Sequence, residues 1–148
     1  MSDQNNSNWE SFAPSPTANS STFKILVIDD SPFVRAQVKD ILGNLMVTLV
    51  EAEDGEDGWQ KLQKHSDIRF VLCDVNMPKL DGLGLIKRIS DKMGKVSFPI
   101  VMLTTENQLD KVLAAKKYGA TAWLIKPPQP QDLQKIVKKF LEQTKKAS

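Results

Sequence analysis

The chain has 148 residues, a single cysteine and a formal net charge of +2, from 20 lysines and arginines against 18 aspartates and glutamates. That length is typical of one domain with its own hydrophobic core, and so small a charge imbalance gives no reason to expect nucleic acid or a membrane surface as the partner. An internal disulfide is excluded, no apolar run approaches the roughly 18 residues of a membrane span, and the first residues lack the pattern of a secretory signal, so we expect a cytoplasmic protein.

The first segment, residues 1–22, is rich in Asn, Ser and Pro and shows neither helical nor strand periodicity. We therefore expect a disordered N-terminal tail, followed by a single domain over residues 23–145. Trp9 and Phe12 could form a short docking motif in this tail, although isolated aromatic residues in a flexible segment are the simpler interpretation.

From residue 23 onward, short apolar runs alternate with segments whose apolar residues recur at helical spacing. The predicted strands are residues 24–28, 47–51, 69–73, 99–103 and 121–125. The predicted helices are residues 32–43, 55–65, 82–92, 107–118 and 130–144. Ser31 and Pro32 are suited to the start of the first helix, and Gly43 and Gly119 lie where two helices should end.

This alternation predicts an α/β fold, because right-handed crossovers place helices on both faces of a parallel sheet. Three of the strands are nearly uninterrupted apolar runs, as expected for strands that are covered on both faces. Five strands fit a doubly wound, flavodoxin-like three-layer sandwich with strand order 2-1-3-4-5. Ligands of such sheets bind outside the carboxyl ends of the strands, where the strand order reverses.

Charged or polar residues stand at the ends of four predicted strands. Asp29 and Asp30 follow the first strand, and the third, fourth and fifth strands are followed by Asp74, Thr104 and Lys126. Three gathered carboxylates would repel one another by roughly 1 kcal/mol per pair at 4 Å in water, and by about 4 at an effective dielectric of 20. We therefore expect Mg²⁺ and a lysine ammonium to compensate them. A carboxylate beside such a cation and an ammonium can attack phosphorus.

Each of these residues also has an ordinary structural interpretation. Acidic side chains stabilise the first turn of a helix by about 0.3–1 kcal/mol, so the two adjacent aspartates could simply serve the helix that follows them. Thr104 could end a strand without further role, and Lys126 could be a surface lysine. The occurrence of the whole set at strand ends favours one common site.

The set resembles the receiver domains of two-component response regulators, most closely the single-domain chemotaxis response regulators. The resemblance covers residues 23–145. It rests on the pair Asp29-Asp30, on Asp74 within CDVNMPKLDG, on Thr104 within LTTEN and on Lys126-Pro127. Five matching positions in order are far more specific than two adjacent aspartates alone.

The resemblance implies the roles of the site residues. Asp74 is expected to accept a phosphoryl group, and Lys126 is expected to contact that group. The expected ligands of Mg²⁺ are Asp29, Asp30, Asp74 and the backbone carbonyl of Asn76. The protein would not be an enzyme in the ordinary sense, because it would assist only its own phosphorylation and dephosphorylation.

The resemblance also implies a conformational switch. Thr104 and Trp123 correspond to the switch pair of the family, in which the hydroxyl moves toward the phosphoryl group and the aromatic ring turns inward. Trp123 departs from the usual Tyr or Phe, which leaves the size of that movement open. The surface expected to bind partners contains Leu109, Lys111, Tyr118, Trp123 and Lys138. The family's Lys-Pro bond is cis, so we expect the same at Lys126-Pro127.

The expected function is that of a stand-alone response regulator, since only about 20 residues follow Lys126. Its partners would be a histidine kinase and possible targets such as a flagellar motor switch protein or a phosphatase, and we expect a monomer. A phosphorelay intermediate or a phosphate sink remains an alternative within the family. A phosphatase with an aspartate nucleophile is an alternative from another class, although its D-x-D motif is missing here because Ser31 stands two residues after Asp29. A non-phosphorylated scaffold is the third alternative.

Overall fold

The computed structural model describes residues 23–147; residues 1–22 and residue 148 lie outside the described part. The predicted disordered tail, with Trp9 and Phe12, therefore lies outside the described residues. Among the helices of the described part, none is long and apolar enough to cross a membrane.

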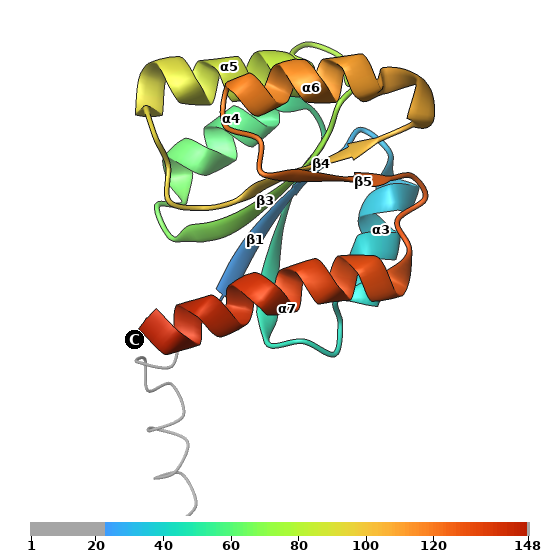
Figure 1. The fold of residues 1–148 in the computed structure, drawn as a ribbon, viewed down its shortest axis with the longest axis vertical. Coiled ribbons are helices and arrows are strands. Elements are labelled where there is room, and N and C mark those ends of the chain that lie inside the picture. Colours follow the sequence, from blue (N-terminus) through green and yellow to red (C-terminus); the bar gives the residue numbers. More distant parts are fainter. Residues whose placement is uncertain (1–22, 148) are drawn as a thin grey trace, which may run out of the picture.

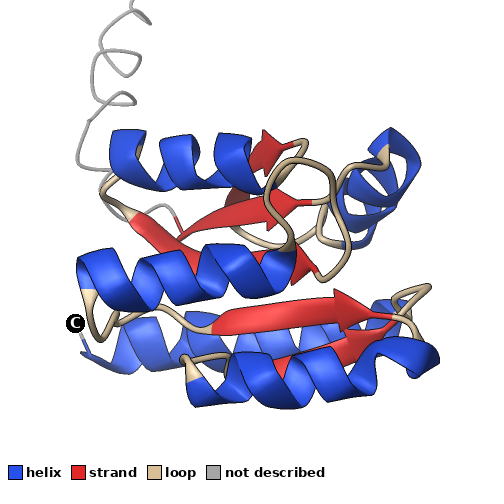
Figure 2. Ribbon diagram, turned by 90° about the horizontal axis from the view of Figure 1, so that it is seen from above, coloured by secondary structure: helices blue, strands red, loops and turns tan. Residues whose placement is uncertain are grey.

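The centre of the fold is one parallel sheet of five strands. The strands are β1 (Phe23–Ile28), β2 (Val47–Ala52), β3 (Ile68–Asp74), β4 (Ile100–Thr104) and β5 (Ala122–Ile125). Their order is β2-β1-β3-β4-β5, which confirms the predicted doubly wound topology. In the view of Figure 2 the strand arrows point toward the same end of the sheet. Asp74 and Thr104 are the last residues of β3 and β4, and Asp29 and Lys126 directly follow β1 and β5.

Helices cover both faces of the sheet. They are α3 (Pro32–Ile41), α4 (Gly55–Lys64), α5 (Gly82–Met93), η1 (Glu106–Gln108, a 3₁₀ turn), α6 (Leu109–Lys117) and α7 (Pro130–Ala147). Helices α3 and α7 lie on one face, and α4, α5 and α6 lie on the other (Figure 1). Each face has its own apolar core, with Val38 and Val137 in one and Leu62 and Ile86 in the other. The sheet is therefore sealed on both sides, which leaves its carboxyl edge for a site.

The helix starts follow from local hydrogen bonds. The side chain of Ser31 accepts a hydrogen bond from the backbone N–H of Val34 and caps α3, and Pro32 takes the first helical position. Asp54 and Asp81 cap α4 and α5 in the same way. Each of the three helices that follow β1, β2 and β3 therefore starts at a side-chain cap.

The helix ends differ in places from the sequence prediction. Helix α3 ends at Ile41, two residues earlier than predicted, and its C-cap is Leu42, so Gly43 directly follows the end of the helix as expected. Gly119 follows α6 with a φ of +116°, a conformation that glycine adopts without strain. The helix predicted over residues 107–118 begins as the 3₁₀ turn η1, and the last helix continues three residues beyond the prediction, to Ala147.

Candidate metal and phosphoryl-acceptor site

The ends of β1 and β3 bring three acidic side chains together. Carboxylate oxygens of Asp29, Asp30 and Asp74 lie within 4.8 Å of one another. Asp29 and Asp74 are 0% and 3% exposed, whereas Asp30 faces solvent. Burial weakens the screening by water, so each pair of charges repels more strongly than on the surface. The cluster therefore requires positive charge.

Lys126 supplies one positive charge from the end of β5. Its Nζ lies 3.0 Å from Asp29 Oδ2 and 3.0 Å from Asp74 Oδ1. The backbone N–H of Lys126 donates a 2.8 Å hydrogen bond to the carbonyl of Thr104, which fixes this strand end against β4. The Lys126-Pro127 peptide bond is cis, as expected. The structure thus brings three of the predicted residues into direct contact.

Asp29 is held by residues that follow it in the chain. Its Oδ1 accepts a 2.9 Å hydrogen bond from the backbone N–H of Ser31. The guanidinium of Arg35 donates to the backbone carbonyl of Asp29 at 2.6 Å and bonds to Glu51 at 3.0 Å. The sequence analysis missed Arg35. Arg35 lies four residues after the N-cap Ser31, and residues at this spacing lie on the same side of a helix. This spacing could have indicated that the side chain of Arg35 points back toward Asp29.

The loop after Asp74 is packed against the strand end. The backbone N–H of Asn76 lies 3.4 Å from Asp74 Oδ1, and the N–H of Gly82 donates to the carbonyl of Val75 at 2.8 Å. A Cβ atom at Gly82 would lie 2.3 Å from the carbonyl oxygen of Asp74, so only glycine fits. Sequence analysis also missed Gly82, although the Asp-Gly pair before a helix marks a tight loop.

The ionisation of the site reflects its burial. Burial raises the pKa of the Asp74 carboxyl, and the charge of Asp29 acts in the same direction, so the contact with Lys126 offsets the rise only in part. Burial alone would lower the pKa of the Lys126 ammonium, but the two carboxylates outweigh it and the pKa is raised. Lys126 is therefore a cation at neutral pH, and an additional cation would favour ionised Asp74.

The residues present fit a hard divalent cation. Three carboxylates face one ammonium, so the cluster keeps an excess of negative charge. Among the residues that the structure describes, none donates a well-directed hydrogen bond to the buried Oδ2 of Asp29. This oxygen forms an ion pair with Lys126 and could also accept a metal ion. Oxygen ligands of this kind are those that Mg²⁺ prefers.

Thr104 and Trp123 stand on the neighbouring strands β4 and β5, where Trp123 is paired with Met102, two residues before Thr104. Thr104 is fully buried and follows Leu103, the residue of β4 that is paired with Asp74. Its hydroxyl donates a 2.9 Å hydrogen bond to the carbonyl of Thr105. Trp123 is 41% exposed, so its ring lies at the surface in this conformation.

The predicted partner surface follows the exposed edge strand β5. Leu109, Tyr118 and Trp123 are all at least 38% exposed. Lys111 is partly exposed on α6, and Lys138 is exposed on α7. These residues lie on successive elements that flank one sheet edge, which is compatible with a common surface.

Comparison with known proteins finds relatives along most of the chain. The sequence model of the response regulator receiver domain matches residues 25–138. The chemotaxis protein CheY1 of Helicobacter pylori is 37% identical over 111 residues, which cover 74% of this chain and 90% of that protein. The chemotaxis protein CheY homolog of Campylobacter jejuni is 35% identical over 119 residues, covering 80% of this chain and 92% of the relative.

Solved structures show the same fold. The chemotaxis response regulator CheY4 of Vibrio cholerae superposes with a TM-score of 0.72 at 34% identity, over 80% of this chain and 98% of that one. A response regulator receiver domain from Clostridium thermocellum superposes with a TM-score of 0.75 at 28% identity, over 85% and 99% of the two chains.

Proposed function

The chain belongs to the family of response regulator receiver domains, and on that premise we propose that Asp74 accepts a phosphoryl group from a histidine kinase in a chemotaxis pathway. The observation that carries the proposal is the position of Asp74. This buried carboxylate stands at a strand end, 3.0 Å from an ammonium and within 4.8 Å of two further carboxylates.

In the proposed reaction, a carboxylate oxygen of Asp74 forms a bond to phosphorus while the bond between phosphorus and the imidazole nitrogen of the donor breaks. The imidazole leaves with the electron pair and takes up a proton. Asp29, Asp30, Asp74 and the carbonyl of Asn76 would hold Mg²⁺, which would neutralise charge on the transferring group.

The chain's own residues perform the remaining tasks. The ammonium of Lys126 is close enough to Asp74 to contact an added phosphoryl oxygen and to stabilise its charge. Arg35 holds the backbone carbonyl of Asp29 and so helps to position the side-chain carboxylate of Asp29. Hydrolysis of the resulting acyl phosphate would return the protein to its original state.

Phosphorylation would then alter the partner surface. It adds about −1.5 to −2 charges and strong acceptor oxygens. The buried hydroxyl of Thr104 would leave the carbonyl of Thr105 and donate to the phosphoryl group, and the vacated space would admit the ring of Trp123. The surface that includes Leu109 and Tyr118 would change its affinity for a partner.

The assignment of Asp74 is tested by labelling with radioactive acetyl phosphate in Mg²⁺. Asp74→Asn should take up no label, because an amide is not nucleophilic enough. Asp91→Asn, at an exposed position on α5, is the matched control and should label like the unmodified protein. Equal labelling of Asp74→Asn would overturn the assignment.

The chemotaxis role is supported by the relatives, whose printed names are chemotaxis proteins and which are matched over about nine-tenths of their length. A pull-down with and without beryllofluoride, which mimics the phosphoryl group, distinguishes the candidates. Retention of a flagellar switch component only with beryllofluoride is expected. Retention of a histidine phosphotransfer domain would instead favour a phosphorelay. A separate assay with small phosphate esters tests the phosphatase alternative, which turnover of these esters would favour.

A further inference from the structure

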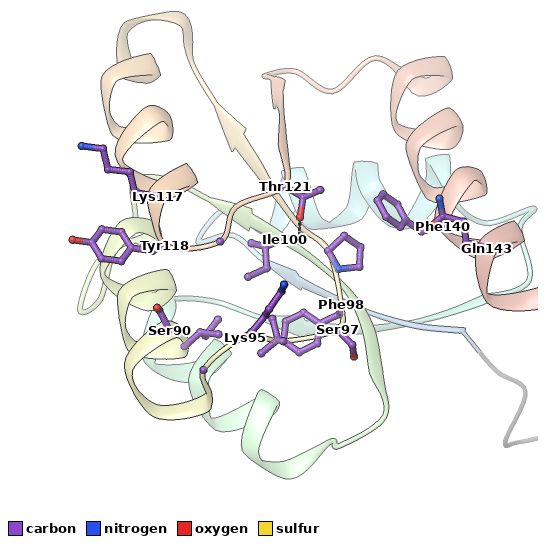
Figure 3. A pocket seen from close by; sticks show the side chains of 15 residues that line it. Ser90, Lys95, Ser97, Phe98, Ile100, Lys117, Tyr118, Thr121, Phe140 and Gln143 are labelled. Atoms are coloured by element: carbon purple, nitrogen blue, oxygen red, sulfur yellow. Dashed lines mark hydrogen bonds between the residues drawn. The ribbon is translucent and has the colours of Figure 1, made fainter. Parts of the chain in front are cut away.

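A groove lies at the edge of the sheet opposite the acidic cluster. It consists of two adjoining hollows with volumes of about 550 and 230 Å³, which share the segment Ser97–Pro99 and two residues of α7. Figure 3 shows the larger hollow, in which Phe98 and Ile100 lie between Tyr118 on one side and Phe140 on the other. We call this the basic groove, and its charged lining residues are Arg69, Lys95 and Lys117.

The floor of the basic groove is apolar and its rim is cationic. Val96 and Phe98 are only half-buried, so a ligand could still cover them. Arg69, Lys95 and Lys117 are all exposed, and none of the three forms an ion pair with another residue of the described part. No carboxylate is among the described residues that line it. A complementary ligand would therefore combine aromatic side chains with negative charge.

The N-terminal segment of this chain has that composition. Residues 1–22 contain Asp3 and Glu10 but neither lysine nor arginine, and Glu10 lies between Trp9 and Phe12. We propose that the basic groove binds this segment of the same chain, with the aromatic side chains of Trp9 and Phe12 on the apolar floor and the carboxylate of Glu10 near the lysines of the rim.

The segment is attached to the domain close to the basic groove. The segment joins the domain at Phe23, the first residue of β1, and Lys24 is paired with Ile68, which lines the smaller hollow. Neighbouring strands are ~4.8 Å apart, and Ile100 at the start of β4 is level, through Val71, with Leu26, three residues after Phe23. The start of β4 therefore lies about 14 Å from the start of β1. The eleven residues from Phe12 to Phe23 span at most ~36 Å and on average ~18 Å as a flexible chain. The segment reaches the groove easily, at a high effective concentration.

The docked segment would adjoin the proposed partner surface. Tyr118 lines the basic groove and also belongs to that surface. Binding of residues 1–22 would therefore cover one end of the surface. The basic groove lies at the amino ends of the strands and Asp74 at their carboxyl ends, so binding of the segment does not depend on whether Asp74 is the phosphoryl acceptor.

Two-dimensional ¹H–¹⁵N NMR of the full chain tests the proposal. Replacing the two aromatic residues in Trp9→Ala/Phe12→Ala should shift backbone amide signals of residues 94–100 and 117–121, and should leave the strand ends near Asp74 unchanged. Asn5→Ala/Asn6→Ala is the control in the same segment and should shift neither region. Absence of groove shifts in the aromatic variant would overturn the proposal.

A second pair of variants tests the charge. Lys95→Glu/Lys117→Glu should abolish most of the spectral difference between the native and the aromatic-deleted segment, whereas Lys39→Glu/Lys64→Glu, at exposed positions on α3 and α4, should preserve it. The native shifts should be independent of protein concentration, because the contact is intramolecular. Shifts that grow with concentration, together with a doubled mass in light scattering, would instead identify a second copy as the occupant.

Discussion

The ammonium of Lys126 lies 3.0 Å from Asp74 Oδ1, although 52 positions in the sequence separate the two residues. The contact arises because β3 and β5 run parallel, with β4 between them, and end at the same edge. Lys126 contacts Asp29 at the same distance, so one cation bridges two buried carboxylates. The same oxygens are those expected to bind Mg²⁺.

Replacing Lys126 by methionine should therefore strengthen Mg²⁺ binding. Methionine keeps much of the apolar length of lysine but removes the positive charge that competes with the metal for Asp29 and Asp74. We expect about a tenfold increase in affinity, or about 1.4 kcal/mol. Isothermal calorimetry of Lys126→Met measures it, with Lys111→Met on α6 as the control. Equal or weaker binding in Lys126→Met would contradict the competition.

The proposed switch predicts that the environment of Trp123 depends on the hydroxyl of Thr104. In a background with Trp9→Phe and Trp59→Phe, the fluorescence of Trp123 should change when the protein is phosphorylated, because a ring that is 41% exposed becomes buried. Thr104→Val keeps the shape of the side chain but cannot donate a hydrogen bond, so the fluorescence change should disappear while Asp74 is still labelled. Thr104→Ser should retain the change. A full fluorescence change in Thr104→Val would show that the movement of Trp123 does not depend on the hydroxyl of Thr104.

Much of the fold follows from the sequence because the relevant signals are local. Apolar runs at short spacing define the strands, Ser31 caps α3, and the crossover rule then determines on which sides the helices lie. The carboxyl ends of parallel strands meet at one edge, which is why Asp29, Asp74 and Lys126 could be placed together before any contact was known.

Other features of the site depend on distances that no local pattern encodes. The clamp from Arg35 to the carbonyl of Asp29 requires α3 to cross the strand end at one angle, and its partner Glu51 lies on a different strand. The direction of the Thr104 hydroxyl, toward the next carbonyl, is one of several local options.

Thr105 predicts a slow loss of the phosphoryl group. Thr105 directly follows Thr104, which is expected to donate to the phosphoryl group, and a side chain larger than alanine at this position narrows access of water to that group. Its hydroxyl also lies within hydrogen-bond distance of the side chains of Asn107 and Gln108, so it organises the η1 turn. Thr105→Ala should shorten the lifetime of the phosphorylated form several-fold, as measured by loss of radioactive label.

Thr105→Ser separates the two effects, because serine keeps the hydroxyl and lacks the methyl group. If steric shielding by the methyl group slows hydrolysis, the lifetime of Thr105→Ser should approach that of Thr105→Ala. A lifetime of Thr105→Ser equal to the native one would assign the effect to the η1 turn, and an unchanged lifetime in Thr105→Ala would remove Thr105 from the mechanism.

Gly82→Ala should weaken both the fold and the site. Its Cβ would lie 2.3 Å from the carbonyl oxygen of Asp74, so the backbone must shift, at a cost of about 1–3 kcal/mol. Gly43→Ala is the matched control, because its nearest atoms lie at 3.4 Å, and it should be neutral or stabilise by up to about 1 kcal/mol. Urea unfolding measures the free energy of unfolding of each variant, and an unchanged dependence on urea concentration shows that the two values can be compared. Since the displaced backbone carries Asp74, labelling of Gly82→Ala by acetyl phosphate should slow even in conditions where the variant is fully folded. Native stability together with native labelling would show that the loop relaxes without moving the acceptor.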